Sequence, residues 1–375
     1  MNKRFRKLIN DIHLWLGLGS GIILFVVCLT GTIYTFRTEI DEYLNKDTYF
    51  FEALPAVGLM NADDLVAAVS QSEKAAVTGF TIPSRADRYW TFSLKPVQTK
   101  KGSGNERGKQ VLVNPYTGEV MGGIETGTGR FFQTVMKLHR WLLMEQKTGR
   151  IIVGIATIVF TFLLLSGLIL WFPKKLRYWK QGFFILFSGK WKRINYDLHN
   201  VLGFYSFIVL LVMALTGLCW SFEWYKKGMS KILGAPVLQR GGGKPLESKI
   251  APGNTVALSG VLKQGNEILP QKGTVRLTIP EDSTGVYVFT KNNQNAFNVT
   301  GTDRLSIDQY SGEIIKVEKF ADKTFRQKIA ASIKPLHTGE IYGWFSKIIY
   351  FISCLIATSL PVTGTFVWWN KRRKR

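Results

Sequence analysis

Four long apolar stretches divide the chain, and each has the length that a helix needs to cross a bilayer. They cover roughly residues 14–36, 151–172, 201–222 and 347–369. About 20 apolar residues span the hydrocarbon core of a membrane as an α-helix. The centres of these stretches contain no Asp, Glu, Lys or Arg, which counts against an ion-coupled transporter. The pattern predicts an integral membrane protein with four transmembrane helices.

Two long polar segments, at about 37–138 and 223–336, separate the predicted helices. Each contains a short helical pattern, followed by alternating apolar and polar residues around a Tyr-Thr/Ser-Gly-Glu turn. The turns lie in "NPYTGEV" at 116–119 and in "DQYSGEI" at 310–313, and such a pattern is typical of a β-hairpin. We therefore expect one compact α+β module in each segment. Because helix, module, helix and basic segment then recur in the same order, the sequence also predicts an internal tandem duplication.

Basic residues are concentrated beside the apolar stretches. The formal net charge is +23, and much of it lies in "MNKRFRK", "PKKLRYWKQGFFILFSGKWKR" and "KRRKR". By the positive-inside rule these runs are cytoplasmic, so both termini are inside and both long segments outside. Because the charge follows the helix ends, we expect the lipid bilayer as its partner and no binding to nucleic acid.

The four histidines occupy equivalent places in the two halves of the chain. His13 in "DIHLWLG" and His199 in "DLHNVLG" begin the first and third helices, and His139 and His337 precede the second and fourth. Each membrane face thus carries two histidines. A pair of neutral imidazoles is what axial ligation of haem iron requires. Since Cys-x-x-Cys-His is absent from the sequence, such a haem would be held non-covalently; the alternative is four interfacial polar residues.

Small residues recur in the same helices. Every apolar stretch contains a Thr-Gly or Ser-Gly pair, and two further glycines follow His13 and His199 by one turn. Helical rise places each pair near the level of two histidines, so we expect the glycines to give clearance to a haem; close helix packing is the alternative. The glycines are Gly31, Gly167, Gly217, Gly364, Gly17 and Gly203.

The segments around His139 and His337 are expected to be short interfacial helices, turning at Thr148-Gly149 or Thr338-Gly339. Arg140, with Lys137 and Lys334, is a candidate partner for haem propionates; these cations could equally be solvated.

The predicted organisation has seven parts. They are a first transmembrane helix (1–36), a first module (37–138), an interfacial segment with the second helix (139–172), a basic cytoplasmic loop (173–198), the third helix (199–222), a second module (223–336), and an interfacial segment with the fourth helix and basic tail (337–375).

Taken together, the His-x-x-Leu-Gly helix starts, the Thr/Ser-Gly pairs, "SGLILWFPKK" and the twin hairpins resemble the PepSY-associated transmembrane proteins. That family includes iron-regulated inner-membrane proteins and ferrisiderophore reductases of bacteria. The resemblance implies a four-helix core in the bacterial inner membrane, two periplasmic PepSY-like modules and two b-type haems. It implies that His13, His139, His199 and His337 are the axial ligands.

The leading hypothesis is a di-haem oxidoreductase that passes electrons outward to a ferric siderophore or another periplasmic iron chelate. Its electron donor is left open between a quinol and a cytoplasmic reductase. One alternative is a non-enzymatic periplasmic binding or sensor protein with structural histidines. Another is a permease for iron or its siderophore, which the uncharged apolar stretches count against.

Overall fold

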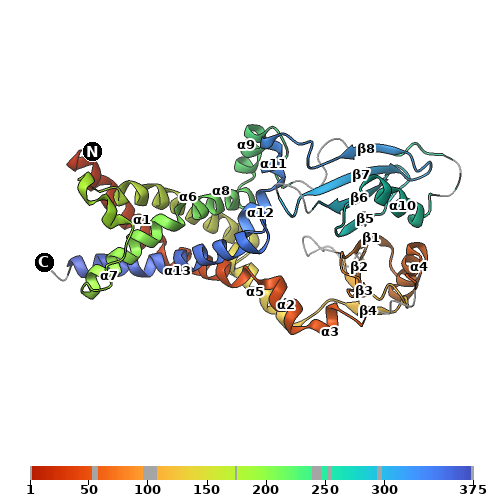
Figure 1. Ribbon diagram of the computed structural model, residues 1–375, viewed down its shortest axis with the longest axis horizontal. Helices are drawn as coiled ribbons and strands as arrows, with labels where there is room; N and C mark the ends of the chain where they lie inside the picture. Colours follow the sequence, from red (N-terminus) through yellow and green to blue (C-terminus); the bar gives the residue numbers. More distant parts are fainter. Residues whose placement is uncertain are drawn as a thin grey trace. The chain divides into compact units, whose positions relative to one another are not determined.

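The computed structural model describes residues 2–52, 58–95, 108–173, 175–238, 246–251, 253, 255–293 and 298–372, so the last three residues of the basic tail lie outside it. The chain forms two compact units (Figure 1). The membrane unit comprises residues 1–37, 130–239 and 329–375, and the sheet unit comprises 38–129 and 240–328.

Four helices of the membrane unit, among the residues described, are long and apolar enough to cross a bilayer. They are α1 (Lys3–Tyr34), α6 (Gln146–Trp171), the segment Trp191–Ser221 and α13 (Trp344–Arg372). The prediction of four membrane helices is confirmed. The third starts earlier than predicted, because α7 (Trp191–Asp197) and a π-helical turn η2 (Leu198–Leu202) run directly into α8 (Gly203–Ser221).

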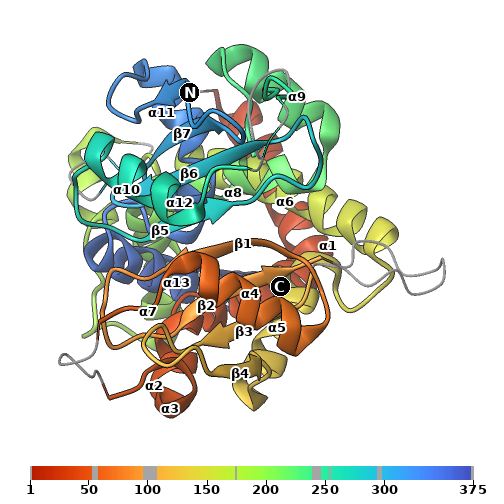
Figure 2. The same cartoon turned by 90° about the vertical axis from the view of Figure 1, so that its right-hand side faces the viewer.

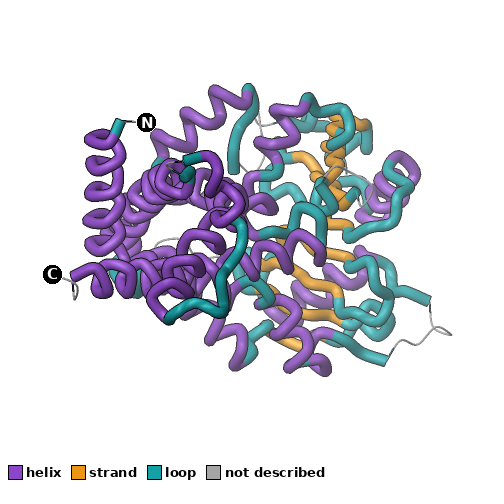
Figure 3. Tube along the Cα trace, turned by 60° about the vertical axis from the view of Figure 1, so that its left-hand side comes forward, coloured by secondary structure: helices purple, strands orange, loops and turns teal. Residues whose placement is uncertain are grey.

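The two halves of the chain interlock within the membrane unit. Helix α1 packs against α6 and α13, and α8 packs against α6 and α13. Figure 3 traces the chain with its helices in purple and its strands in orange. Leu164, Leu210, Ala214 and Ala357 form a buried cluster where these helices meet. Most of the remaining apolar surface of the four helices faces outward, as expected of helices surrounded by lipid.

Short helices connect the membrane helices. They are α5 (Gly127–Trp141), η1 (Leu176–Gly182), α9 (Glu223–Leu233), α11 (Phe325–Ala331) and α12 (Ile333–Thr338). Helix α12 ends at Gly339 in the left-handed conformation, close to the predicted turn.

The turn predicted at Thr148-Gly149 is wrong, because both residues lie inside α6. The chain turns instead at Leu142 and Leu143, both with positive φ. Gly149 is needed for a different reason: a Cβ there would collide with the Trp141 backbone.

The sheet unit contains one eight-stranded antiparallel sheet in the order β4-β3-β2-β1-β5-β6-β7-β8. Helices α4 (Ala62–Glu73) and α10 (Leu258–Ile268) lie on one face of it (Figure 2). The remaining helices are α2 (Arg37–Leu44) and α3 (Lys46–Tyr49). The strands are β1 (Val77–Ile82), β2 (Trp90–Leu94), β3 (Gln110–Val113), β4 (Val120–Gly123), β5 (Val275–Thr278), β6 (Val286–Asn292), β7 (Thr302–Asp308) and β8 (Ile314–Glu318).

Each half of the chain contributes one helix and four consecutive strands, and both predicted hairpins are present as β3–β4 and β7–β8. The halves join where β1 pairs with β5, for example at Phe80 and Leu277. Gly79 permits this contact, since a Cβ there would lie 2.5 Å from the Leu277 carbonyl oxygen. The sequence did not predict that the two strand sets share one sheet.

Candidate functional site

The structure brings the four histidines together as two pairs within the membrane unit. The ring centroids of His13 and His199 lie 6.4 Å apart, with 87° between the ring planes. The centroids of His139 and His337 also lie 6.4 Å apart, with 56° between the planes. We call these the first pair and the second pair. Each combines one histidine from each half of the chain.

In the first pair, each imidazole bonds to a hydroxyl of a neighbouring helix. His13 Nδ1 lies 2.8 Å from Ser166 Oγ, and His199 Nδ1 lies 2.9 Å from Thr363 Oγ1. Ser166 donates its own proton to the Phe162 carbonyl, as Thr363 does to Ser359. A hydroxyl has one proton, so each oxygen accepts from the histidine, and Nδ1 carries the hydrogen.

In the second pair, each imidazole bonds to a backbone carbonyl. His139 Nδ1 lies 2.9 Å from the Val27 oxygen, and His337 Nδ1 lies 2.9 Å from the Met213 oxygen. Thr30 Oγ1 and Thr216 Oγ1 lie slightly farther from Nδ1, at 3.3 and 3.2 Å. A carbonyl can only accept, so Nδ1 is protonated here as well. All four neutral rings therefore present Nε2, with its lone pair, as the possible metal-binding nitrogen.

The glycines of the Ser/Thr-Gly pairs lie against the imidazole rings. A Cβ added at any of them would come within 3.0–3.4 Å of Cε1 of one imidazole. The contacts are Gly167 with His13 (3.4 Å), Gly364 with His199 (3.2 Å), Gly31 with His139 (3.3 Å) and Gly217 with His337 (3.0 Å). The space that these glycines leave is thus filled by imidazole, whereas the sequence led us to expect clearance for a macrocycle. A Cβ at Gly17 or Gly203 would lie 3.8 Å from Leu163 or Leu360, an ordinary contact between helices.

The distance between the ring centroids in each pair is compatible with two imidazoles bound to one metal. A bound metal lies about 2.0–2.1 Å from an imidazole nitrogen, which is about 1.1–1.2 Å from its ring centroid, so two rings on one metal have centroids about 6.2–6.6 Å apart. The rings are also only half-buried. Among the described residues, no three His, Cys, Asp or Glu side chains could hold a bare ion. Two imidazoles per site suit an iron whose other four ligands come from a porphyrin.

The basic residues proposed for haem propionates lie on the two short helices that carry the second pair. Arg140 follows His139 directly, is half-buried, and has its guanidinium 5.2 Å from the centroid of the Trp141 ring. Lys137 and Lys334 are exposed. Trp220 also lies beside the second pair, with its ring centroid 5.1 Å from that of His337, and the sequence analysis missed it.

Further polar residues hold the first pair's helices in place, and the sequence analysis missed these as well. Arg6 donates to the Leu170 and Phe172 carbonyls at the end of α6. Buried Asn195 donates to the Thr363 carbonyl. Buried Asp197 accepts hydrogen bonds from the backbone N–H of Leu186 and from Arg193. These bonds hold the loop that contains Leu186 against α7. The sequence signals for them were their distance of two to seven residues from a histidine and, for Asp197, the Asp-x-His pattern that it shares with Asp11.

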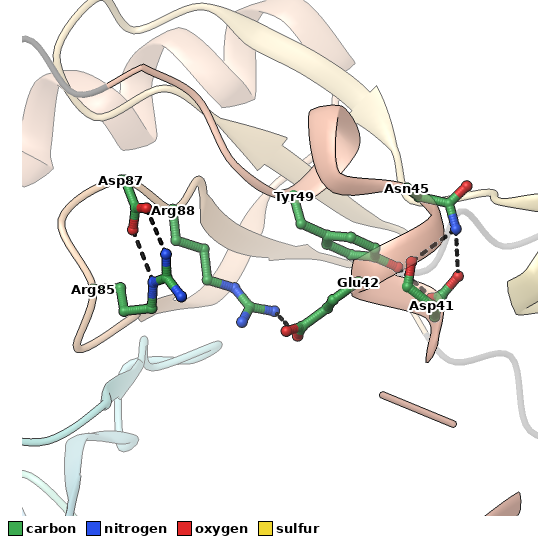
Figure 4. Close-up of polar contacts among 7 residues, drawn as sticks. All are labelled: Asp41, Glu42, Asn45, Tyr49, Arg85, Asp87 and Arg88. Atoms are coloured by element: carbon green, nitrogen blue, oxygen red, sulfur yellow. Dashed lines mark hydrogen bonds and ion pairs between the residues drawn. The ribbon is translucent and has the colours of Figure 1, made fainter. Parts of the chain in front are cut away.

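A second polar cluster lies in the sheet unit, centred on Asp41 of α2 (Figure 4). The Asp41 carboxylate accepts hydrogen bonds from Asn45, Tyr49, Thr126 and Thr128 at 2.6–2.9 Å. Burial and the Asp41 carboxylate raise the pKa of Tyr49, so the phenol stays protonated. The cluster fastens α2 and α3 to residues 126–128 and uses both carboxylate oxygens.

Comparison with known proteins agrees with the membrane architecture. No curated protein matches the chain significantly. The profile of the family described as the PepSY-associated TM region matches residues 11–371, which include all four histidines and all or most of each membrane helix. The chain is therefore a multi-pass membrane protein that belongs to the PepSY-associated TM family.

Proposed function

We propose that the protein is a di-haem oxidoreductase of the bacterial inner membrane, which passes electrons from the cytoplasmic or quinone side to the periplasm and reduces the iron of a ferric siderophore or a similar chelate. One observation carries the proposal: two imidazole pairs, each with both Nε2 atoms available, at the two ends of one helix. His13 and Gly31, which contacts His139, are 18 residues apart on α1. This separation is about 27 Å along the helix and approaches the roughly 30 Å of the hydrocarbon core.

The chain's own side chains would hold and orient the cofactors. Each Nε2 would bind iron, while the hydrogen bond from Nδ1 fixes the tautomer and the plane of its ring. A bound haem supplies reversible one-electron exchange at its iron. Apolar residues between the two levels, including buried Leu164, Leu210 and Ala357, would exclude water and protons from the path.

The basic flanks support the direction of transfer. Lys and Arg residues cluster beside the His13 and His199 ends of their helices, and under the positive-inside rule the first pair would then lie on the cytoplasmic side. The second pair would then face the periplasm. Reduction of iron(III) to iron(II) weakens binding by hard oxygen chelators, because iron(II) is a softer ion, and would release iron for uptake.

The absorption spectrum of the purified protein tests the proposal. Protein expressed with adequate haem should show Soret and α bands after reduction by dithionite, with two haems per chain. His13→Ala and His139→Ala should each remove about one haem, while Ile12→Ala, at an exposed position beside His13, should keep both. Protein without these bands would contradict the proposal and favour a non-enzymatic binding or sensor protein. Loss of haem from neither histidine variant would contradict the ligand assignment.

A further inference from the structure

We propose that the hydroxyls of the Ser/Thr-Gly pairs are positioning groups that tune the axial histidines, and that Ser166 and Thr363 tune the first pair more strongly than Thr30 and Thr216 tune the second. The inference rests on the proposed function. It concerns the four hydroxyl side chains beside the histidines, which are not themselves proposed as iron ligands.

Every imidazole has a hydroxyl oxygen near Nδ1, but the distance from Nδ1 to that oxygen differs between the two pairs. At the first pair, the hydroxyl is close to Nδ1, at 2.8 Å for Ser166 and 2.9 Å for Thr363. At the second pair the closest acceptor is a carbonyl at 2.9 Å, and Thr30 and Thr216 are more distant, at 3.3 and 3.2 Å. The two members of each pair agree although they come from different halves of the chain.

Every one of these hydroxyls is held in an orientation that favours accepting. Each donates its proton to carbonyls three and four residues earlier on its own helix, as Ser166 does to Phe162 and Leu163. Thr363, Thr30 and Thr216 make the equivalent bonds. The oxygen therefore offers its lone pair to Nδ1, and the glycine beside it lets the ring approach.

The acceptor on Nδ1 controls how strongly the imidazole donates to iron. A stronger Nδ1–H···O bond gives the ring more anionic character, which stabilises iron(III) and lowers the reduction potential. Removal of the Ser166 hydroxyl takes away the closest acceptor of His13 and leaves it only the backbone carbonyl of Leu163. Removal of the Thr30 hydroxyl leaves His139 with its closest acceptor, the Val27 carbonyl at 2.9 Å. The potential of the first site should therefore rise more.

Additional contacts keep the first pair's hydroxyls in position. Asn195 holds the carbonyl of Thr363 itself, and Arg6 holds the end of α6 a few residues beyond Ser166. His199 lies on the π-helical turn η2, and such irregular turns often mark functional positions. The backbone that bears each of the two first-pair hydroxyls is therefore held by hydrogen bonds from other segments, as a positioning role requires.

Spectroelectrochemical titration of the holoprotein, with haem content measured on the same samples, tests the inference. Ser166→Ala and Thr363→Ala should each shift the oxidation equilibrium of one haem about tenfold towards the reduced state, or about 59 mV for one electron. Thr30→Ala and Thr216→Ala should shift the other haem less than threefold. Ser166→Thr should restore the unsubstituted potential. Thr161→Ala is the matched control, because Thr161 makes the same bond within α6, to the Thr157 carbonyl.

The outcomes separate this inference from the proposed function. Equal shifts in all four alanine variants, or two retained haems and unchanged potential in Ser166→Ala, would overturn the inference and leave the di-haem proposal standing. Unsubstituted protein without haem would overturn both. If Ser166→Ala loses the first haem, Ser166→Cys keeps the size of the side chain with a weaker acceptor; an unchanged potential in that variant would overturn the inference.

Discussion

The Asp41 cluster of the sheet unit and the histidines of the membrane unit are both networks of partly buried polar groups, but they differ in what they leave unused. Both oxygens of Asp41 accept hydrogen bonds from side chains of the same unit. Each histidine engages Nδ1, and among the described residues no hydrogen bond to Nε2 is present. Burial and hydrogen bonding alone therefore do not distinguish the two networks; the unused bonding capacity at Nε2, repeated with the same geometry, does, and our proposal rests on it.

The two units also join the halves of the chain by different means. In the sheet unit, backbone hydrogen bonds between β1 and β5 make the junction continuous. In the membrane unit, each histidine pair takes one ring from each half, so a ligand bound to both rings would link the halves. Substitutions should therefore affect either ligand binding or local stability, according to the unit in which they lie.

The largest effect is expected where a side chain would displace an imidazole. A Cβ at Gly217 would lie 3.0 Å from His337 Cε1, and the two γ-methyl groups of valine would push the ring further, which strains its 2.9 Å bond to the Met213 carbonyl. Gly217→Val should therefore lose one of two haems while keeping the haem of the first pair, as measured by haem content per chain. Gly203→Ala is the control, since its Cβ would make only an ordinary 3.8 Å contact, and it should keep both. Two retained haems in Gly217→Val would show that the ring position is not essential.

The sequence predicted those parts of the fold and the site that depend on residues close together in the chain, and it missed those that depend on distant residues. The membrane helices follow from 20-residue apolar stretches, and the hairpins follow from turns such as 310–313. The equivalence of the histidines was visible in their spacing. The hydroxyl of Ser166 was overlooked because only the neighbouring glycine was interpreted. The β1–β5 junction depends on pairing between residues about 200 positions apart, and Gly79 within β1 weakened its strand pattern.

Asp41→Asn is expected to have a smaller effect, a loss of local stability confined to the sheet unit. The substitution replaces one acceptor oxygen by an amide donor, which then faces either the Tyr49 hydroxyl at Oδ2 or the Thr126 and Thr128 hydroxyls at Oδ1. Unsatisfied or opposed buried groups of this kind cost about 2–3 kcal/mol. Hydrogen–deuterium exchange should accelerate in peptides covering α2, α3 and 126–129, with two haems per chain retained. Asp47→Asn, at an exposed position of α3, should change neither measurement. Loss of haem from Asp41→Asn would contradict the separation of the two networks.

The smallest effect is expected in the hairpin turns, where the two halves differ by one charge. Asp308 Oδ1 accepts from the backbone N–H groups of Tyr310 and Ser311, and Oδ2 accepts from Lys249, whereas Asn114 at the equivalent turn accepts from Tyr116. Asp308→Asn keeps an acceptor oxygen but weakens the bonds that the charge had strengthened. We expect a loss of about 1 kcal/mol of local stability at pH 7, measured by hydrogen–deuterium exchange of β7 and β8.

The effect of Asp308→Asn on the local stability of the hairpin should depend on pH. Burial acts to raise the pKa of Asp308, but the N–H groups of Ser311, Tyr310 and Lys249 outweigh it and hold the pKa below its ordinary value. A carboxyl with a lowered folded-state pKa stabilises the fold above its unfolded pKa of about 3.9, and this stabilisation is lost as the pH falls through the folded-state value. The difference in exchange between Asp308→Asn and the unsubstituted protein should therefore be present at pH 7 and shrink towards pH 3. A difference of equal size at both values would mean that the Asp308 charge contributes nothing, and that the two turns are equivalent in energy as well as in shape.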